Sequence, residues 1–249
     1  MTKDRSKPIL TRLLPAAVLG LCASLSLFGQ AKSPPANFKD EGVFLVYQAN
    51  RVIAVEEFSI EIDRSGIRAE GKTEFRVNPI TKGSSSKSVA ELRLDGSWGL
   101  VSYRWRQTQS GGRGSKIQVS FKDKMVQVVV SPAGGPRQKR KFILSPDVAI
   151  LDNNFMHHYG LLLKRYDPKR GGWQMFQAFI PQQVDPGLVT VEAKAKEEVD
   201  LDLDGGRKAR LNRYDIQSNS LKLTVWADDQ GRLQSLSSPQ QQIRIFRKR

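Results

Sequence analysis

Apolar and polar residues alternate along most of the chain with a period of two, which is typical of β-strands with one wet face. Between Val52 and Ile62, for example, acidic residues and serine alternate with phenylalanine and isoleucine. Clusters of glycine, asparagine, aspartate or serine separate such segments, as turns do. The pattern predicts strands near residues 43–47, 52–62, 67–77, 89–95, 100–107, 116–121, 125–130, 139–144, 173–180, 188–195, 207–216, 221–227, 233–236 and 243–246.

One segment, residues 145–166, follows the period of an α-helix instead. Its apolar arc on the helical wheel holds Leu151, Phe155, Met156, Tyr159, Leu162, Leu163 and Tyr166. Its polar arc holds Asn153, Asn154, His157, Lys164 and Arg165. The helix start is open between Ser145 and Asp152, and Asp167-Pro168 ends the helix. We therefore expect one amphipathic helix whose apolar arc, including Leu151, Phe155, Tyr159 and Leu162, is buried against a sheet.

The connections between the predicted strands are short, which favours hairpins and therefore an antiparallel sheet. A sheet of about a dozen strands does not stay flat, so it must curl or close. The helix is the natural filling of the concave side. The sequence thus predicts a mainly β fold, a long curved antiparallel meander (an open or half barrel) wrapped around one amphipathic helix.

The N-terminus has the order of features of a secretory signal peptide. Four basic residues precede an apolar run from Leu13 to Phe28, and Gly29 and Ala31 supply the small residues of a cleavage site. The run is shorter than the roughly 20 residues of a membrane span. An uncleaved anchor and lipidation at Cys22 are the alternatives. We expect cleavage after Ala31 and export to the periplasm or cell envelope.

The interpretation of the N-terminus as a signal peptide divides the chain into three parts. Residues 1–31 form the signal peptide, residues 32–37, with Pro34-Pro35, form a linker, and residues 38–249 form a single domain. The predicted mature part contains no cysteine, so its stability must come from the core and the sheet rather than from disulfides.

The chain is strongly basic, with 40 Lys and Arg against 25 Asp and Glu and a net charge of +15. Such an excess attracts polyanions. For an exported protein these are an anionic membrane or cell-wall polymers, whereas nucleic acid is disfavoured. The densest basic cluster, which we expect to bind such a surface, is Arg137, Lys139, Arg140 and Lys141.

The acidic segment from Asp200 to Gly205 has the D-x-D-x-D-G spacing that begins a calcium loop. However, the distal glutamate position of such a loop is Leu211, and the leucines between the acids suit a half-buried strand. We therefore favour a hairpin from Glu197 to Ile216, without a metal, over a calcium site.

The expected hairpin has a three-residue loop at residues 204–206. This register pairs Leu201 with Ala209 and Val199 with Leu211 on one face. On the other face it places Lys208 beside Asp202 and Arg210 beside Asp200.

We find no motif that predicts an enzyme. His157 and His158 are the only histidines, and adjacent helical positions point about 100° apart, so we expect one at the surface and one at the rim. The glycine-rich residues 110–116 lack the glycine that precedes the lysine of a phosphate loop. Their composition instead predicts a hairpin turn. Glu56 and Glu57 are neighbours on a strand and face opposite ways. We expect no catalytic residue and no cofactor.

A curled sheet with a helix over its mouth commonly leaves an apolar cavity. Core packing is the ordinary role of aromatic residues, but five apolar residues could line such a cavity: Phe155, Tyr159, Leu162, Trp173 and Trp226. We therefore predict a monomeric, non-enzymatic binding protein for an apolar or amphipathic, lipid-like ligand. The alternative is an envelope scaffold that attaches through its basic surface and has no cavity. A cavity of a few hundred Å³ beside the helix would favour the first function.

The C-terminal half contains RLNRY, LKLTVWADDQGRLQSL, a proline and a final IRIFR. In this order the chain resembles exported bacterial domains of unknown function that are built as long β-meanders. The opening GVFLVYQANRVIAVEEFSIEI and the central HYGLLLKRYD are similar to the same pattern. By architecture the chain is also similar to periplasmic half-barrel lipoprotein carriers, which implies a sheet wrapped around a helix and a site for acyl chains. The resemblance implies no functional residue.

Overall fold

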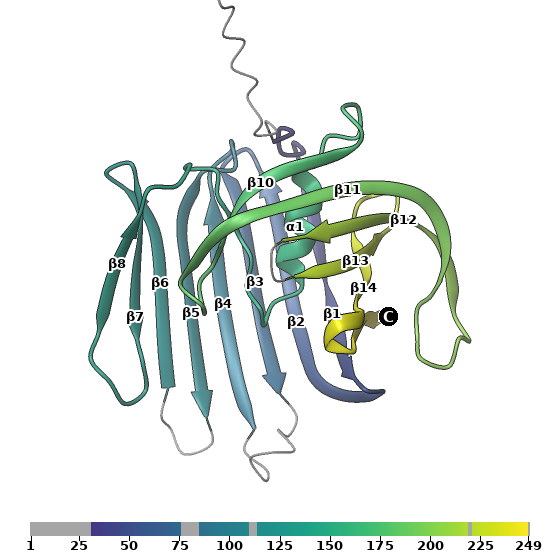
Figure 1. Cartoon of the computed structure of the whole chain (residues 1–249), viewed down its shortest axis with the longest axis horizontal. Coiled ribbons are helices and arrows are strands. Elements are labelled where there is room, and N and C mark those ends of the chain that lie inside the picture. Colours follow the sequence, from purple (N-terminus) through teal and green to yellow (C-terminus); the bar gives the residue numbers. More distant parts are fainter. Residues whose placement is uncertain (1–30, 76–84, 110–113, 219–220, 249) are drawn as a thin grey trace, which may run out of the picture.

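The computed structural model describes residues 31–75, 85–109, 114–218 and 221–248, which form one sheet of fifteen strands and one α-helix (Figure 1). The strands before the helix are β1 (Phe38–Gln48), β2 (Arg51–Asp63), β3 (Gly66–Phe75), β4 (Ser86–Leu94), β5 (Leu100–Gln109), β6 (Gly114–Lys122), β7 (Met125–Ser131), β8 (Gln138–Phe142) and β9 (Ala149–Ile150). After the helix α1 (His157–Arg165) come β10 (Trp173–Ile180), β11 (Asp185–Asp200), β12 (Lys208–Gln217), β13 (Lys222–Ala227), β14 (Leu233–Ser238), the 3-10 helix η1 (Pro239–Gln241) and β15 (Ile243–Lys248).

The strands follow one another as a meander that is interrupted once. The spatial order is β8-β7-β6-β5-β4-β3-β2-β1-β15-β14-β13-β12-β11-β10-β9, and every neighbouring pair is antiparallel except β9 with β10. The first and last strands pair with each other, with Val43 opposite Lys248. The sheet therefore has β8 and β9 as its edges and does not close into a complete barrel. This confirms the predicted mainly β, open antiparallel meander.

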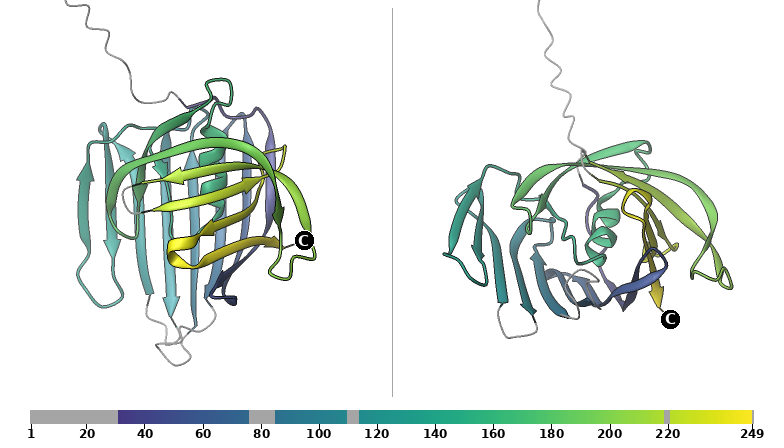
Figure 2. Two further views of the ribbon diagram at one scale, coloured as in Figure 1. Left: turned by 45° about the vertical axis from the view of Figure 1, so that its right-hand side comes forward. Right: turned by 60° about the horizontal axis from the view of Figure 1, so that its bottom comes forward.

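The sheet curls so that β1–β8 form a broad layer and β10–β13 cross in front of it, with α1 between the two (Figures 1 and 2). Side chains alternate across the sheet: on β2, Phe58, Ile60 and Ile62 are buried, whereas Glu57 and Glu61 are exposed. The apolar positions of the alternating pattern thus face the helix, and the hydrophobic core fills the space around it.

The helix is much shorter than the sequence pattern predicts, because residues 145–156 are not helical. Ala149 and Ile150 form β9, and the N–H of Leu151 donates to the carbonyl of Phe179 (3.0 Å). The apolar arc is nevertheless buried as predicted at Leu151, Phe155, Tyr159 and Leu162. An irregular backbone wrapped against the core can therefore produce the same burial pattern as a helix.

The helix also lacks the expected solvent-exposed face. His157, His158, Leu161 and Arg165 are all buried, so the prediction of a surface histidine and a rim histidine is wrong. The reason is that strands of the same sheet lie on both sides of α1, and the polar arc meets protein rather than water (Figure 2).

The hairpin formed by β11 and β12 has a register that differs from the prediction by two residues. Val199 lies opposite Ala209 and Asp200 lies opposite Lys208, so the connecting loop is longer than three residues. Inside this loop the N–H of Gly206 donates to Asp202 Oδ1 (3.0 Å), which ties Asp202 into the turn. A shift of two leaves each side chain on its predicted face, because side chains alternate with a period of two.

The N-terminal region lies largely outside the described residues, and so does the predicted signal peptide apart from Ala31. The predicted linker is anchored at its first residue, because the N–H of Lys32 donates to the carbonyl of Arg165 (2.9 Å). The carbonyl of Lys32 in turn accepts the indole N–H of Trp98 (2.6 Å). In the part of the chain that the structure describes, no helix is long and apolar enough to cross a membrane.

Candidate functional site

A partly open apolar pocket lies at the N-terminal end of α1, where β1–β3 meet β13–β15. Its volume is about 110 Å³, and we call it the mouth pocket. The lining residues are Val46, Ile53, Ala54, Thr73, Phe75, Asn153, Asn154, Met156, Tyr159, Leu223, Leu236, Ser238, Gln241, Ile243 and Ile245. Most are aliphatic or aromatic, and none is charged, so the mouth pocket suits an uncharged group.

One polar atom in the mouth pocket has no partner. The hydroxyl of Ser238 is buried, yet it forms no hydrogen bond with any described residue. Thr73, by contrast, donates from its hydroxyl to the carbonyl of Asn154 (2.8 Å). Because a buried hydroxyl without a partner is costly, Ser238 is a natural contact for a polar group that enters the pocket.

A buried carboxylate fixes the start of α1 next to this pocket. Met156, the N-cap residue, has no capping side-chain hydrogen bond of its own. Instead, Glu56 of β2 accepts the backbone N–H groups of Met156 (2.7 Å) and His157 (3.3 Å). Glu56 therefore supplies, from another strand, the acceptor that the first turn of a helix needs.

The same carboxylate is paired with a histidine side chain. Glu56 Oε1 lies 2.5 Å from His157 Nδ1. Burial raises the pKa of Glu56 to about 8, against the lowering effect of the Met156 and His157 N–H groups. Burial lowers the pKa of His157 to about 3. One shared proton leaves this pair without net charge, which makes its complete burial tolerable.

A second buried polar group holds the loop before the helix. The hydroxyl of Tyr103 on β5 donates to Asp152, and the side chain of Gln182 donates to the Tyr103 oxygen (3.3 Å). Burial raises the pKa of Asp152 to about 6, although the hydrogen bond from Tyr103 opposes this. The N–H of Asn154 donates to Asp152 (2.7 Å), so the aspartate shapes the turn that lines the mouth pocket.

A close approach of strand and loop completes the helix start. Gly71 of β3 lies against Phe155 and His157: an added Cβ would come within 2.4 Å of the Phe155 ring and 2.6 Å of the His157 ring. The ring of Phe58 stacks on His157 with a centroid distance of 5.7 Å. The helix start is therefore held both by polar partners and by tight packing.

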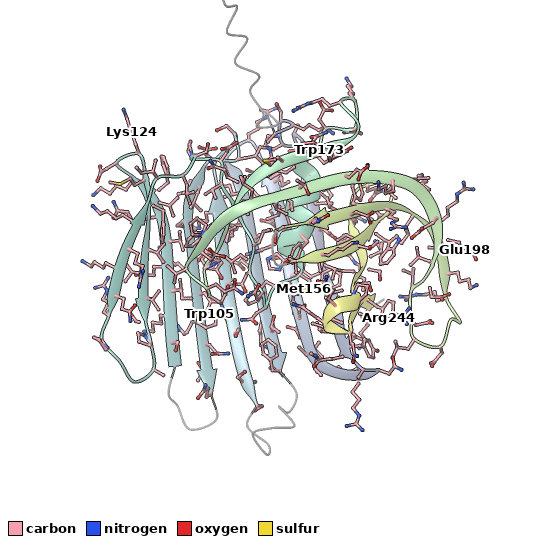
Figure 3. All side chains as sticks on the ribbon, in the orientation of Figure 1. Trp105, Lys124, Met156, Trp173, Glu198 and Arg244 are labelled. Atoms are coloured by element: carbon pink, nitrogen blue, oxygen red, sulfur yellow. The ribbon has the colours of Figure 1, made fainter. Side chains whose placement is uncertain are left out.

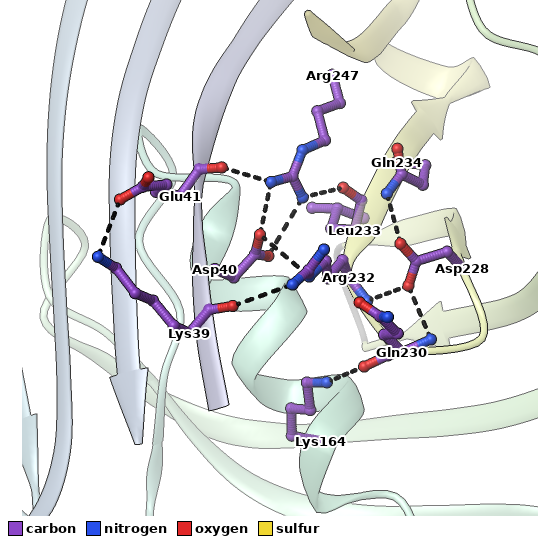
Figure 4. A network of polar contacts seen from close by, with 10 residues as sticks. All are labelled: Lys39, Asp40, Glu41, Lys164, Asp228, Gln230, Arg232, Leu233, Gln234 and Arg247. Carbon is purple, nitrogen blue, oxygen red and sulfur yellow. Dashed lines mark hydrogen bonds and ion pairs between the residues drawn. The ribbon is translucent and has the colours of Figure 1, made fainter. Parts of the chain in front are cut away.

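The other end of α1 carries a separate polar network (Figure 4). Asp40 of β1 accepts two hydrogen bonds from Arg247 of β15, at 2.5 and 3.2 Å. Lys164 donates to the carbonyl of Gln230, and burial lowers the pKa of Lys164 to about 8. This network joins the first and last strands and links the helix to the turn after β13.

The structure brings together only part of the predicted ligand-lining set. Tyr159 lines the mouth pocket, whereas Phe155, just before α1, and Leu162, within α1, are buried in the core and do not line it. Trp173 on β10 is 60% exposed and lies away from the pocket (Figure 3). Trp226 is half-buried on the other face of β13 from Val225, where its indole N–H donates to Glu197 (2.6 Å). The two tryptophans therefore do not line the mouth pocket.

The predicted basic cluster lies on and beside the edge strand β8. The side chains of this strand alternate between the two faces of the sheet, so the cluster does not lie on one face. Lys139, Arg140 and Lys141 belong to β8, and all three are exposed, as is Arg137. Arg140 lies opposite Val128, which is buried, so Arg140 is on the inner face. Lys139 and Lys141 are on the outer face.

Three residues of the buried polar groups were not predicted: Glu56, Tyr103 and Asp152. A signal for Glu56 was present, since it shares the face of Phe58 and Ile60 on an alternating strand and therefore had to point into the core. Asp152 was identified only as a possible helix start. Within the described ranges, no three His, Cys, Asp or Glu side chains are grouped so that they could hold a metal ion.

The fold and this site define a β-barrel-like domain, an open curled sheet around a buried helix. It is similar to the crystal structure of a β-barrel-like protein of Domain of Unknown Function DUF1849 from Brucella abortus. The TM-score is 0.54 and the identity 7%, with 87% of this chain and 97% of that chain covered. A DUF1089 family protein from Pseudomonas aeruginosa gives a TM-score of 0.43 at 13% identity, with coverages of 90% and 95%.

No family model and no curated protein matches the sequence. At 7% identity the likeness to the Brucella protein concerns the fold alone. It agrees with the resemblance of the sequence to β-meander domains of unknown function.

Proposed function

We propose that this protein is a non-enzymatic binding protein whose mouth pocket holds the apolar end of an amphipathic, lipid-like molecule. The observation that carries this proposal is a partly open apolar pocket that contains the unpartnered hydroxyl of Ser238. The signal peptide predicted at residues 1–31 supports a place of action in the periplasm or cell envelope.

The size of the mouth pocket limits what it can hold. Its volume of about 110 Å³ is below the few hundred Å³ that we expected for a lipid carrier. A dry cavity of roughly 150 Å³ accommodates the six carbons of benzene, so the smaller mouth pocket suits a chain end of about four carbons. The rest of the ligand would extend through the open side, and a hydroxyl or carbonyl near the chain end could pair with Ser238.

The buried polar groups support binding rather than catalysis. Glu56, His157, His158, Tyr103 and Asp152 are all at most 1% exposed, so no substrate atom can approach them without opening the core. Their contacts instead position Asn154 and Met156, which line the mouth pocket. We assign these groups a structural role.

The proposal can be tested with linear alcohols from ethanol to octanol, added to protein with labelled methyl groups. We expect methyl shifts at Leu236, Ile243 and Ile245, and affinity that rises about fourfold per added CH₂. The rise should stop at about four carbons, where the pocket is full. Shifts located elsewhere, or no dependence on chain length, would contradict the proposed site.

Two variants distinguish binding in the mouth pocket from nonspecific binding elsewhere on the protein. Ala54→Leu places bulk in the mouth pocket and should abolish the methyl shifts, while the remaining spectrum reports that the fold is intact. Ser238→Ala should weaken butanol binding about fivefold through loss of one hydrogen bond. Ser237→Ala, on the opposite face of β14, is the matched control and should bind as the parent protein does.

A further inference from the structure

The outer surface of the sheet has two halves with different charge. Strands β5–β8 contain no Asp or Glu, but they contain seven basic residues: Arg104, Arg106, Lys116, Lys122, Lys139, Arg140 and Lys141. Strands β1–β4 mix both signs, with Lys39, Arg51, Arg68, Lys72, Lys87 and Arg93 among nine carboxylates. The positive charge is therefore concentrated at the end of the sheet that leads to the edge strand β8.

The strand register gathers six of these cations on one face. Arg104 lies opposite Gln118, Gln118 opposite Val129, and Val129 opposite Lys139, which makes one row across four strands. Arg106 lies opposite Lys116 in the next row. The positions between them on these strands point inward: Trp105, Ile117 and Val119 are buried, whereas Arg140 on the edge strand β8 is exposed. We call the outward set the basic face: Arg104, Arg106, Lys116, Lys122, Lys139 and Lys141.

The cations of the basic face are exposed and almost unpaired. Arg104 forms an ion pair with Glu91 of β4 at 3.8 Å. The other five form no ion pair with any described residue, and all six side chains lie at exposed positions. On the outer surface of β1–β4, by contrast, cations have close carboxylates, such as Arg68 with Glu70 and Lys87 with Glu74 (2.9 Å).

Exposed apolar side chains accompany this unpaired charge. Among the described residues, five large hydrophobic side chains are exposed, and three of them border or lie beside the basic face: Val89 (52%), Val101 (52%) and Ile143 (89%). Val89 is opposite Arg106, and Ile143 directly follows β8. Exposed apolar groups among cations suit a surface that has both anionic groups and an apolar interior.

We propose that the basic face docks on a bilayer that contains anionic lipids. Along a strand, outward residues repeat about every 6.8 Å, and strands lie about 4.8 Å apart, so the cations form a broad array rather than a line. Such an array fits many lipid phosphates at once, and Ile143 can enter the interface between them. A linear polyanion would use the charges but would gain nothing from Val89, Val101 or Ile143.

The test is co-flotation of the protein with vesicles of phosphatidylcholine alone or with one third phosphatidylglycerol. We expect binding only to the anionic vesicles, and a steep decrease as salt rises from 50 to 500 mM. The variant Arg106→Glu/Lys116→Glu/Lys139→Glu should bind about a hundredfold more weakly, because three attractive contacts are lost. Equal binding to both vesicle types would overturn the proposal.

The matched control has the same change of net charge elsewhere on the molecule. Lys169→Glu/Lys222→Glu/Lys248→Glu reverses three exposed cations outside β5–β8 and should keep most of the binding. If both triple variants lose binding equally, net charge alone is responsible and the basic face is not a docking surface. Thermal melts of both variants confirm that each is folded.

A third variant distinguishes a bilayer from a soluble polyanion. Ile143→Ser leaves every charge in place at a fully solvated position, and it should weaken vesicle binding several-fold while binding to dextran sulfate is unchanged. Binding to dextran sulfate without binding to anionic vesicles would replace the bilayer by a polymer. The mouth pocket takes no part in this test, so its outcome is independent of the proposed ligand binding.

Discussion

Glu56 and Glu57 are neighbours on β2 with the same side chain, yet they lie in opposite environments. Glu56 is 0% exposed and accepts hydrogen bonds from two backbone N–H groups, with the His157 ring nitrogen 2.5 Å away. Glu57 has a side chain that is 64% exposed, and its partner Lys72 lies 3.9 Å away. The alternation of the strand therefore makes one carboxyl part of the core and leaves the other in solvent.

This difference extends to the two faces of the sheet as a whole. On the inner face a polar group is buried with a specific partner, and removal of either member leaves the other unsatisfied. On the outer face charges are hydrated and exchangeable, so they affect what the surface attracts more than whether the protein folds. Four predictions test how sharply the two faces differ.

The largest expected effect is that of Glu56→Ala compared with Glu57→Ala. Loss of Glu56 leaves two N–H groups and the His157 ring without their buried partner, which should lower the free energy of unfolding by about 3–5 kcal/mol. Glu57→Ala should change it by about 0.5 kcal/mol or less. Urea unfolding measures both values, and similar values for the two variants would remove the proposed contrast.

Phe155→Ala should lower the free energy of unfolding by about 3–5 kcal/mol, because it opens a cavity where the aromatic ring packs against Gly71 and His157. Val89→Ala removes an apolar side chain from the outer face and is the control, with an expected change of about 0.5 kcal/mol. A melting temperature of Phe155→Ala within one degree of the parent would show that this ring does not belong to the core.

The pH dependence of stability should reveal Glu56 directly. Its folded pKa of about 8 lies above the unfolded value of 4.5, so the folded state holds one more proton between these values. Glu56 therefore lowers stability by roughly 2 kcal/mol as the pH rises from 6.5 to 8, and the lowered pKa of Lys164 offsets a smaller part of this loss. Thermal unfolding at several pH values measures this loss.

Glu56→Gln supplies the control for this pH dependence. It cannot ionise, so the loss between pH 6.5 and 8 should disappear even though the variant is less stable overall. His157 is not expected to contribute in this window, because its folded pKa of about 3 lowers stability only as the pH falls below 6.5. A parent protein whose stability rises from pH 6.5 to 8 would contradict a buried, protonated Glu56.

The smallest effect is expected at Asp202, in the turn between β11 and β12. Asp202→Asn keeps an oxygen that can accept from the N–H of Gly206, so the free energy of unfolding should change by at most about 1 kcal/mol. Millimolar calcium should stabilise neither form. A calcium-dependent rise in melting temperature that Asp202→Asn abolishes would instead establish a calcium site in this loop.

The sequence was sufficient for the strands other than β9 because alternation records which face of each strand is buried. Short connections then led to the antiparallel meander. The helix was overextended because Leu151 and Phe155 are buried from irregular backbone between β9 and α1, and burial alone does not distinguish these from a helix. The length of the β11–β12 loop depends on the contact of Asp202 with Gly206, which no periodicity reveals.

The candidate site was less predictable than the fold because it depends on contacts between distant segments. Tyr159 was identified from the helical arc, but the pocket beside it is lined by strands from both ends of the chain. The two tryptophans were misplaced because a large aromatic residue indicates burial only on average. Trp173 shows this most clearly, since it lies on the outer face of β10.

The pairing of β1 with β15 has a consequence for how this chain acquires its structure. Strands β1–β8 can pair as successive hairpins while later residues are still being synthesised, but the second edge of β1 must wait for β15. Contacts between residues so far apart in sequence form slowly, because a long loop must close first. The ion pair of Asp40 with Arg247 joins these two strands, so it can form only at this late step. Until then the edges of β1 and β14 stay open to other chains, and slow synthesis of β15 prolongs that exposure.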